Sequence, residues 1–144
     1  MTSVDKSTLL KAFNGQFEEF LDDIVVLFPD NREIKTSKTA LCMMKQANPK
    51  MLLSVWYRYI YVKYADKIEE ENIDFFLDKD YTEDVAKLEK KGGSGTSVIE
   101  SINKLKGPLR ELDEENTSKC LLYLKNLNNL SNMYMNFWDD YHDI

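Results

Sequence analysis

The stretch that most constrains the fold covers residues 48–64 and reads NPKMLLSVWYRYIYVKY. Asn48 is a favoured N-cap residue, because its side-chain oxygen can accept a hydrogen bond from a free amide of the first helical turn. Pro49 follows at the first helical position, where its missing N–H costs no hydrogen bond. The sequence therefore predicts a helix that begins at Pro49 and continues in a more polar form to about residue 70.

This predicted helix is apolar around most of its circumference. Two apolar stripes recur at helical spacing, one with Met51, Leu52, Val55, Trp56, Tyr59 and Ile60, the other with Leu53, Tyr57, Tyr61 and Tyr64. A helix that is apolar on several sides is usually interior. We therefore expect a core helix with a border of tyrosines. The alternative is that Tyr57, Arg58 and Tyr61 form an exposed platform that stacks on a peptide or a base.

Helical periodicity extends over most of the remaining chain. It predicts helices over about residues 7–27, 33–47 and 116–141 and a helical turn over 73–77, and it predicts two helical pieces with a kink or a break at Gly107–Pro108. The residues expected on the inner faces are Leu10, Phe13, Phe17, Ile24, Leu27 or Phe28, Ile34, Leu41, Met44, Val98, Ile102, Leu105, Leu109, Leu112, Cys120, Leu124, Leu127 and Tyr134. The residues expected to face solvent are Lys35, Lys38, Lys45, Asn126, Asn128, Asn129 and Asn132.

The segment around residues 78–97 interrupts this pattern. It is highly charged at first and then reads LEKKGGSGTS, which holds three of the five glycines of the chain. Such a composition is typical of a flexible linker, expected at about residues 90–97, and it is also that of an engineered loop replacement. Ser97 and Glu100 then have capping-box spacing. The whole sequence predicts one all-α domain over residues 1–144, an antiparallel bundle of about five helices around the central buried helix.

No catalytic, metal or nucleotide motif stands out in the sequence. His142 is the only histidine, so a Ser-His-Asp or Cys-His site would depend on a terminus that tends to fray. The acidic residues Glu18, Glu19, Asp22 and Asp23 have no neighbouring histidine or apolar pocket that would separate their pKa values, so we expect a solvated face. CxxC, HExxH, GxGxxG and P-loop patterns are absent. We therefore expect no enzyme, no cofactor and no metal site.

Charge and cysteine usage bear on partners and location. The net charge of −6 argues against a generic binder of phosphate backbones. Cys42 and Cys120 lie in helical patterns and are expected to be buried free thiols. With no signal peptide and no apolar run of the ~20 residues that span a bilayer, we expect a soluble, intracellular protein without membrane insertion.

Three stretches carry a family resemblance. They are FLDDIVVLFPDN with TSKTALCMMKQANP at residues 20–31 and 36–49, VWYRYIYVKYADKIEEENIDFFLDKDY at 55–81, and INKLKGPLRELDEENTSKCLLYLKNLNNL at 102–130. Together they resemble small helical proteins encoded by large nucleocytoplasmic DNA viruses of algae and amoebae. The resemblance brings no site residues. It implies a location in the infected cell, in its cytoplasm or nucleus, or in the virion.

These observations predict a non-enzymatic interaction or structural protein that binds another protein through its helical surface. The candidate contact residues are Tyr57, Arg58 and Tyr61, with a second patch of Phe75, Phe76 and Tyr81. One alternative is a nucleic-acid-associated factor that uses a local patch of Lys35, Lys38, Lys45, Lys50 and Arg58. A viral mimic of the helical apoptosis regulators, which bind an amphipathic peptide between helices, is a second alternative. Homo-oligomerisation is also left open.

Overall fold

Short polar side chains determine where the long helices begin. The computed structural model describes residues 5–70, 73–78, 86–87, 90 and 96–142, and the side chains of residues 75–76, 78, 96–97 and 137–142 are outside this description. Asp5 accepts a hydrogen bond from the amide of Thr8 (2.7 Å), and α1 follows over Lys6–Leu27. Asn31 caps α2 (Arg32–Ala47) in the same way, through the amide of Ile34 (3.1 Å). Each cap supplies an acceptor to an amide that has no partner within its helix.

The second half of the chain adds two long helices. These are α7 (Thr96–Arg110) and α8 (Glu114–His142). Asp113 caps α8 by accepting a hydrogen bond from the amide of Asn116 (2.8 Å). The described residues hold helices and no strands, so the all-α prediction is confirmed. None of the described helices is both long enough and apolar enough to cross a membrane.

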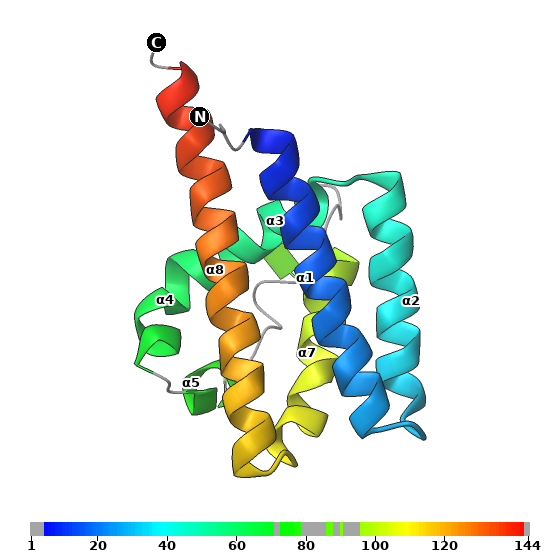
Figure 1. Cartoon of the computed structure of the whole chain (residues 1–144). Helices are drawn as coiled ribbons and strands as arrows, with labels where there is room; N and C mark the ends of the chain where they lie inside the picture. The colour runs from blue at the N-terminus through cyan, green and yellow to red at the C-terminus, as the bar shows by residue number, and fades with distance from the viewer. Residues whose placement is uncertain (1–4, 71–72, 79–85, 88–89, 91–95, 143–144) are drawn as a thin grey trace.

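The four long helices run alternately down and up in Figure 1. The most extensive helix contacts are those of α1 with α8 and of α2 with α7. Behind α1 and α8, one continuous helical passage crosses the bundle, formed by α3 (Met51–Trp56), the π-helical η1 (Tyr57–Tyr61) and α4 (Val62–Glu69). The short α5 (Ile73–Asp78) follows, and the carbonyl of Leu77 accepts a hydrogen bond from Arg110 at the end of α7.

The spacing of the buried residues in the crossing passage explains its π-helical turn. At 3.6 residues per turn, each step of four residues rotates about 40° beyond a full turn, so a buried face repeated every fourth residue would drift around a regular helix. In η1 the amide of Val62 bonds the carbonyl of Tyr57, five residues back, which widens the helix at its middle. This wider turn offsets the drift and keeps one face towards the core. The buried residues at steps of four are Leu52, Trp56, Ile60, Tyr64 and Ile68, and Leu53, Val55 and Tyr59 of the same passage are buried as well.

Several helix boundaries differ from the predictions. The central helix begins at Met51, and its cap position Lys50 has no side-chain capping bond. Asn48 instead accepts a hydrogen bond from the amide of Lys50 (3.3 Å) and stabilises the turn between α2 and α3. The predicted break at Pro108 was wrong, since α7 passes through Pro108 as one helix and ends two residues later at Arg110.

The predicted linker and capping box lie at the start of α7. This helix begins at Thr96, so Ser97 lies inside its first turn and is not its cap. Residues 91–95 of the predicted linker lie outside the described residues. The linker therefore stays a prediction over that part, while its last two residues are helical.

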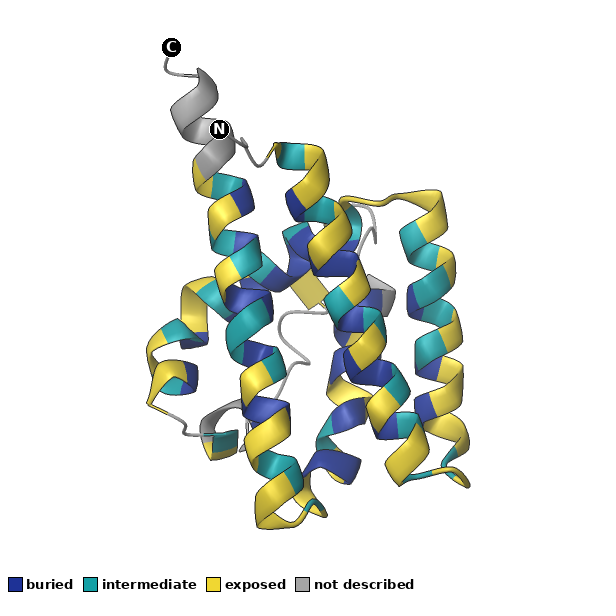
Figure 2. Cartoon of the chain, viewed as in Figure 1, coloured by how far each residue is buried: buried dark blue, intermediate teal, exposed yellow. Residues whose placement is uncertain are grey.

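Most of the predicted inner-face residues are buried, and Met44, Leu112 and Phe28, the alternative to Leu27, are half-buried against the core. Leu9 rather than Leu10 is buried at the start of α1, because the inner face is rotated by one residue there. Leu27 at the end of the same helix is exposed. Cys42 is half-buried, whereas Cys120 is buried as expected, and both thiols are free. Figure 2 shows the exposed last turn of α1 at the lower end of the bundle.

Candidate functional site

The first predicted contact patch lies on the π-helical turn. Tyr57 and Tyr61 are both half-buried, and their ring centroids are 5.2 Å apart with a 31° angle between the planes. Arg58 is exposed. The structure thus brings these three side chains onto one segment, at the border that the core-helix interpretation predicts. Because the two rings pack on each other, part of their surface is already used within the chain.

The second predicted patch is not described at the level of side chains. Phe75 and Phe76 belong to α5, but their side chains lie outside the described set. Tyr81 lies outside the described residues altogether. This patch therefore stays a prediction.

The acidic face of α1 is tied to the lysines of α2. Lys45 donates to Glu18 (2.7 Å), and Lys38 forms a salt bridge with Asp22. The hydrogen bond to Asp22 raises the pKa of Lys38. The expectation that these two lysines project freely into solvent was wrong, because α2 lies against the acidic side of α1. This pairing also removes charge from the basic patch that the nucleic-acid hypothesis requires.

The predicted polar back of α8 contains a buried residue. Asn128 is only 3% exposed, and its side-chain oxygen accepts a hydrogen bond from the indole N–H of Trp56 (2.8 Å). The expectation that Asn128 faces solvent was therefore wrong, since α3 covers this turn of α8. Asn126 is half-buried and donates to Gln16 of α1 (2.9 Å). Asn129, directly after the buried position, is exposed as expected.

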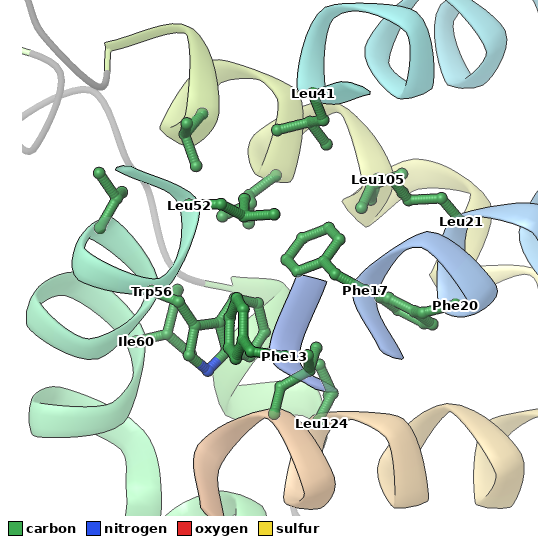
Figure 3. Close-up of a cluster of buried hydrophobic side chains, with 14 of the residues drawn as sticks. Phe13, Phe17, Phe20, Leu21, Leu41, Leu52, Trp56, Ile60, Leu105 and Leu124 are labelled. Carbon is green, nitrogen blue, oxygen red and sulfur yellow. The ribbon is translucent and has the colours of Figure 1, made fainter. Parts of the chain in front are cut away.

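Trp56 is the meeting point of the aromatic core. Figure 3 shows its indole beside Phe13, with Phe17 above them and side chains of α2, α7 and α8 around the cluster. The ring of Phe17 meets the indole edge-on, with centroids 5.6 Å apart at 90°. From Phe17 the contacts continue to Phe20 (6.2 Å) and from there to Tyr123 of α8 (5.3 Å). A chain of aromatic rings therefore connects the centre of the molecule to the surface between α1 and α8.

At the outer end of that aromatic chain the surface is hollowed. A pocket of about 210 Å³, here called the α1–α8 groove, lies between the C-terminal half of α1 and the N-terminal half of α8. Its rim carries two adjacent aliphatic side chains, Val26 (76% exposed) and Leu27 (42% exposed). Its full lining consists of Phe20, Asp23, Ile24, Val26, Leu27, Leu112, Asn116, Lys119, Cys120 and Tyr123. The groove thus combines an apolar floor with an exposed apolar rim.

The thiol and the phenol that line the groove hold their protons. Burial raises the pKa of the Cys120 thiol to about 12. The pKa of Tyr123 is also raised to about 12, first by burial and then by its hydrogen bond to Asp23, with the charges of Glu19 and Asp22 adding to the effect. Since a thiol must ionise to act as a nucleophile or a metal ligand, the groove offers a binding surface and no activated sulfur. Among the described side chains, no three His, Cys, Asp or Glu residues gather to hold a metal ion.

A second hollow lies between α1 and α2. It measures about 360 Å³ and is lined by Val25, Lys35, Lys38, Thr39, Cys42, Met43 and Gln46. Long polar side chains make up much of this lining, and it has no aromatic floor. Lys38, one of the lining residues, is held by Asp22. The α1–α8 groove is therefore the better candidate for specific binding.

Sequence reasoning missed the groove, although a signal was present. Residues 24–28 read IVVLF, an uninterrupted apolar run at the end of a helix. Successive residues of a helix point about 100° apart, so such a run covers more than one side and cannot face one core completely. The run therefore indicates that some aliphatic side chains remain outside, as Val26 and Leu27 do.

Compared with protein-family models, with curated proteins and with solved structures, the chain matches none of them.

Proposed function

We propose that this chain is a non-enzymatic protein-binding module whose α1–α8 groove receives an apolar side chain of its partner. The observation that carries the proposal is the pair of exposed aliphatic residues, Val26 and Leu27, on the rim of a pocket with an aromatic floor. Contiguous exposed apolar surface on a soluble domain commonly marks an interaction site. The volume of the α1–α8 groove, about 210 Å³, is below the roughly 300–1,000 Å³ of typical small-molecule sites. The groove therefore suits an anchor side chain better than a cofactor.

The face formed by Tyr57, Arg58 and Tyr61 is a second candidate surface for the same function. Tyrosine and arginine are enriched among the residues that contribute most to binding energy in protein interfaces. Val62, directly after Tyr61, is 64% exposed and adds an aliphatic side chain to this face. The rings of Tyr57 and Tyr61 already pack on each other, so less of their surface is available to a partner. This face ranks second for that reason.

The nucleic-acid and apoptosis-regulator hypotheses have less support. The nucleic-acid hypothesis depends on Lys38 and Lys45, which are already paired with carboxylates of α1. A salt-sensitive gel shift with a duplex or a single strand would support the nucleic-acid hypothesis. The hypothesis of a viral mimic of apoptosis regulators makes use of a groove between helices, and micromolar binding of a death-domain peptide would favour it. The infected cell or the virion as the location is supported by the sequence resemblance.

A matched pair of variants tests the proposal and separates the two faces. Val26→Lys places a charge on the groove rim, and Val62→Lys makes the same change at a similarly exposed valine beside the tyrosine face. Each protein is immobilised and incubated with a lysate of a plausible host cell, and captured proteins are quantified by mass spectrometry. Binding is then repeated with the purified partner. Circular dichroism first establishes that both variants are folded.

The two faces give opposite outcomes in this experiment. If the groove binds the partner, the purified partner is lost from the Val26→Lys protein and retained by the Val62→Lys protein. The reverse pattern would assign binding to the tyrosine face. Equal binding by all three proteins would contradict both locations.

A further inference from the structure

We infer that the partner segment bound by the α1–α8 groove is a cationic amphipathic helix, with an apolar anchor for the pocket and lysine or arginine residues beside it. The inference rests on the proposed function and adds the chemical class of the partner. A groove between two helices is a common receptor for an amphipathic helix, whose anchors recur every three or four residues. The shape of the groove suggests the anchor, and the charges of its two walls suggest the flanking residues.

The α1 wall of the groove is acidic. Asp23 lines the groove and accepts the hydroxyl hydrogen bond of Tyr123. Glu19 and Asp22 lie close enough to act electrostatically on the same hydroxyl. Asp22 is paired with Lys38, but Glu19 bonds only the neutral side chain of Gln16 among the described contacts. The α1 wall therefore carries carboxylate charge that α2 does not fully neutralise.

The α8 wall adds little positive charge. Lys119 is the one basic residue in the groove lining, and its ammonium lies 3.8 Å from a carboxylate oxygen of Glu115. The first turn of α8 also contains Glu114, directly after the capping residue Asp113. The charge of this single lysine is offset by Glu115, so the α8 wall adds no net positive charge to the groove. The acidic α1 wall favours a positively charged partner, since complementary potentials speed encounter and disfavour wrong partners.

The same charges argue against a second copy of this chain as the occupant. In a symmetric dimer built on the groove, the acidic α1 walls of both copies would be brought into one interface. Like charges placed opposite each other in an interface are unfavourable. The net charge of −6 adds to this repulsion. Complementarity is better satisfied by a basic segment of a different protein.

A peptide selection on the full chain tests the inference. A displayed library of helical peptides, randomised along one face, is selected on the immobilised wild-type protein and depleted on the Val26→Lys protein. We expect enrichment of peptides that carry an aliphatic or aromatic anchor with lysine or arginine within one helical turn. A synthetic peptide from the selection should bind the wild type at least about tenfold more tightly than the Val26→Lys protein.

Charge variants then test the electrostatic part with the same peptide. Lys119→Glu removes the one basic residue of the lining and should tighten binding by about two- to fivefold, the range for one exposed ion pair. Glu19→Gln should weaken binding by a similar factor. Wild-type affinity should fall as salt concentration rises, because exposed charges are screened. Leu122→Lys, at an exposed leucine of α8 outside the groove lining, is the control and should leave affinity unchanged.

The failures of the inference and of the proposed function are distinguishable. Enrichment of neutral or acidic peptides that still depend on Val26 would overturn the cationic partner and leave the protein-binding groove intact. Failure to recover any peptide that distinguishes the wild type from Val26→Lys would overturn both. A wild-type dimer in analytical ultracentrifugation that Val26→Lys dissolves would overturn the inference by assigning the groove to self-association.

Discussion

Asn128 and Val26 occupy opposite kinds of site, and each departs from the usual rule for its residue type. Asn128 is a polar residue buried to 3% exposure in the middle of the bundle. Val26 is an apolar residue with 76% of its surface exposed at the end of α1. Both lie on long helices, and both run against the general tendency to place apolar residues inside and amides outside.

The two residues differ in the contacts that each makes within the chain. The side-chain oxygen of Asn128 accepts the indole N–H of Trp56 within the same chain, whereas its Nδ2 is buried without a hydrogen-bond partner among the described residues. Val26 is outside the hydrophobic core and lines the rim of a hollow. A buried polar residue that bonds within its own chain indicates a structural role, whereas exposed apolar residues beside a hollow point to a surface that another molecule covers. Substitutions at the two sites and between them test this contrast.

The largest effect is expected from Trp56→Ala. The indole is almost fully buried and packs edge-on against Phe13 and Phe17, so its removal leaves a large cavity and an Asn128 without its indole donor. We expect a loss of about 3–5 kcal/mol in the free energy of unfolding. Urea denaturation followed by circular dichroism measures it. A loss below about 1 kcal/mol would mean that the internal site is not the centre of the core.

Asn128→Ala should have the next largest effect. It removes the acceptor of a buried indole N–H, and we expect it to cost about 1–3 kcal/mol of unfolding free energy. The matched control is Asn129→Ala, one residue along α8 and exposed, which should change stability by less than about 0.5 kcal/mol. Equal losses in the two variants would show that burial of Asn128 makes no difference to stability, and the contrast with Val26 would fail.

Tyr123 offers a pH-dependent test at the boundary between core and groove. Its pKa is about 12 in the folded chain against an ordinary value of 10.0, so folding favours the protonated phenol. The resulting stabilisation is fully present below pH 10, where the phenol is protonated in both states, and it is lost as pH rises from 10 to about 12. Wild-type stability should therefore fall more steeply over this interval than that of Tyr123→Phe. Urea denaturation at a series of pH values measures both slopes.

The control for this pH effect is Asp23→Asn. It keeps the Tyr123 ring in place but removes the carboxylate that accepts the hydroxyl hydrogen bond. The pKa of Tyr123, followed by ultraviolet titration against Tyr123→Phe, should move back towards 10.0. An unchanged pKa would mean that burial alone maintains the shift and that the acidic wall has little influence on the groove.

The smallest effect on stability is expected from Val26→Lys. Since Val26 is largely exposed, the substitution removes few internal contacts and should change the unfolding free energy by less than about 0.5 kcal/mol. Its expected effect is on binding alone. Thermal denaturation of the variant beside the wild type checks this point. A destabilisation above about 1.5 kcal/mol would reveal an internal role for Val26 and would break the contrast with Asn128.

Much of the secondary structure could be predicted from local patterns. The caps at Asp5, Asn31 and Asp113 are short acceptors followed by apolar periodicity, and the long helices begin within a few residues of their predicted starts. The π-helical turn was not predicted. The apolar residues that are buried at every fourth position from Leu52 to Ile68 are nevertheless visible in the sequence. A helix end is decided by a few local hydrogen bonds, which a sequence pattern indicates only to within about one or two residues.

The candidate site was less predictable. The sequence placed Tyr57, Arg58 and Tyr61 on one border, and the structure agrees with that placement. It did not indicate that Tyr123 meets Asp23, because the two residues are 100 positions apart and each has an ordinary local sequence. The groove exists only because α1 and α8 lie side by side over Leu112.

Local sequence patterns establish that this chain is helical, where most of its long helices begin to within a few residues, and which residues have the polarity to enter a core. Those properties follow from capping, spacing and side-chain chemistry within a few residues of each position. The burial of Asn128 and the exposure of Val26 depend on how the helices pack together. Whether a helical residue is buried depends on which other helix covers it, and in the case of Asn128 that helix carries Trp56, 72 residues away.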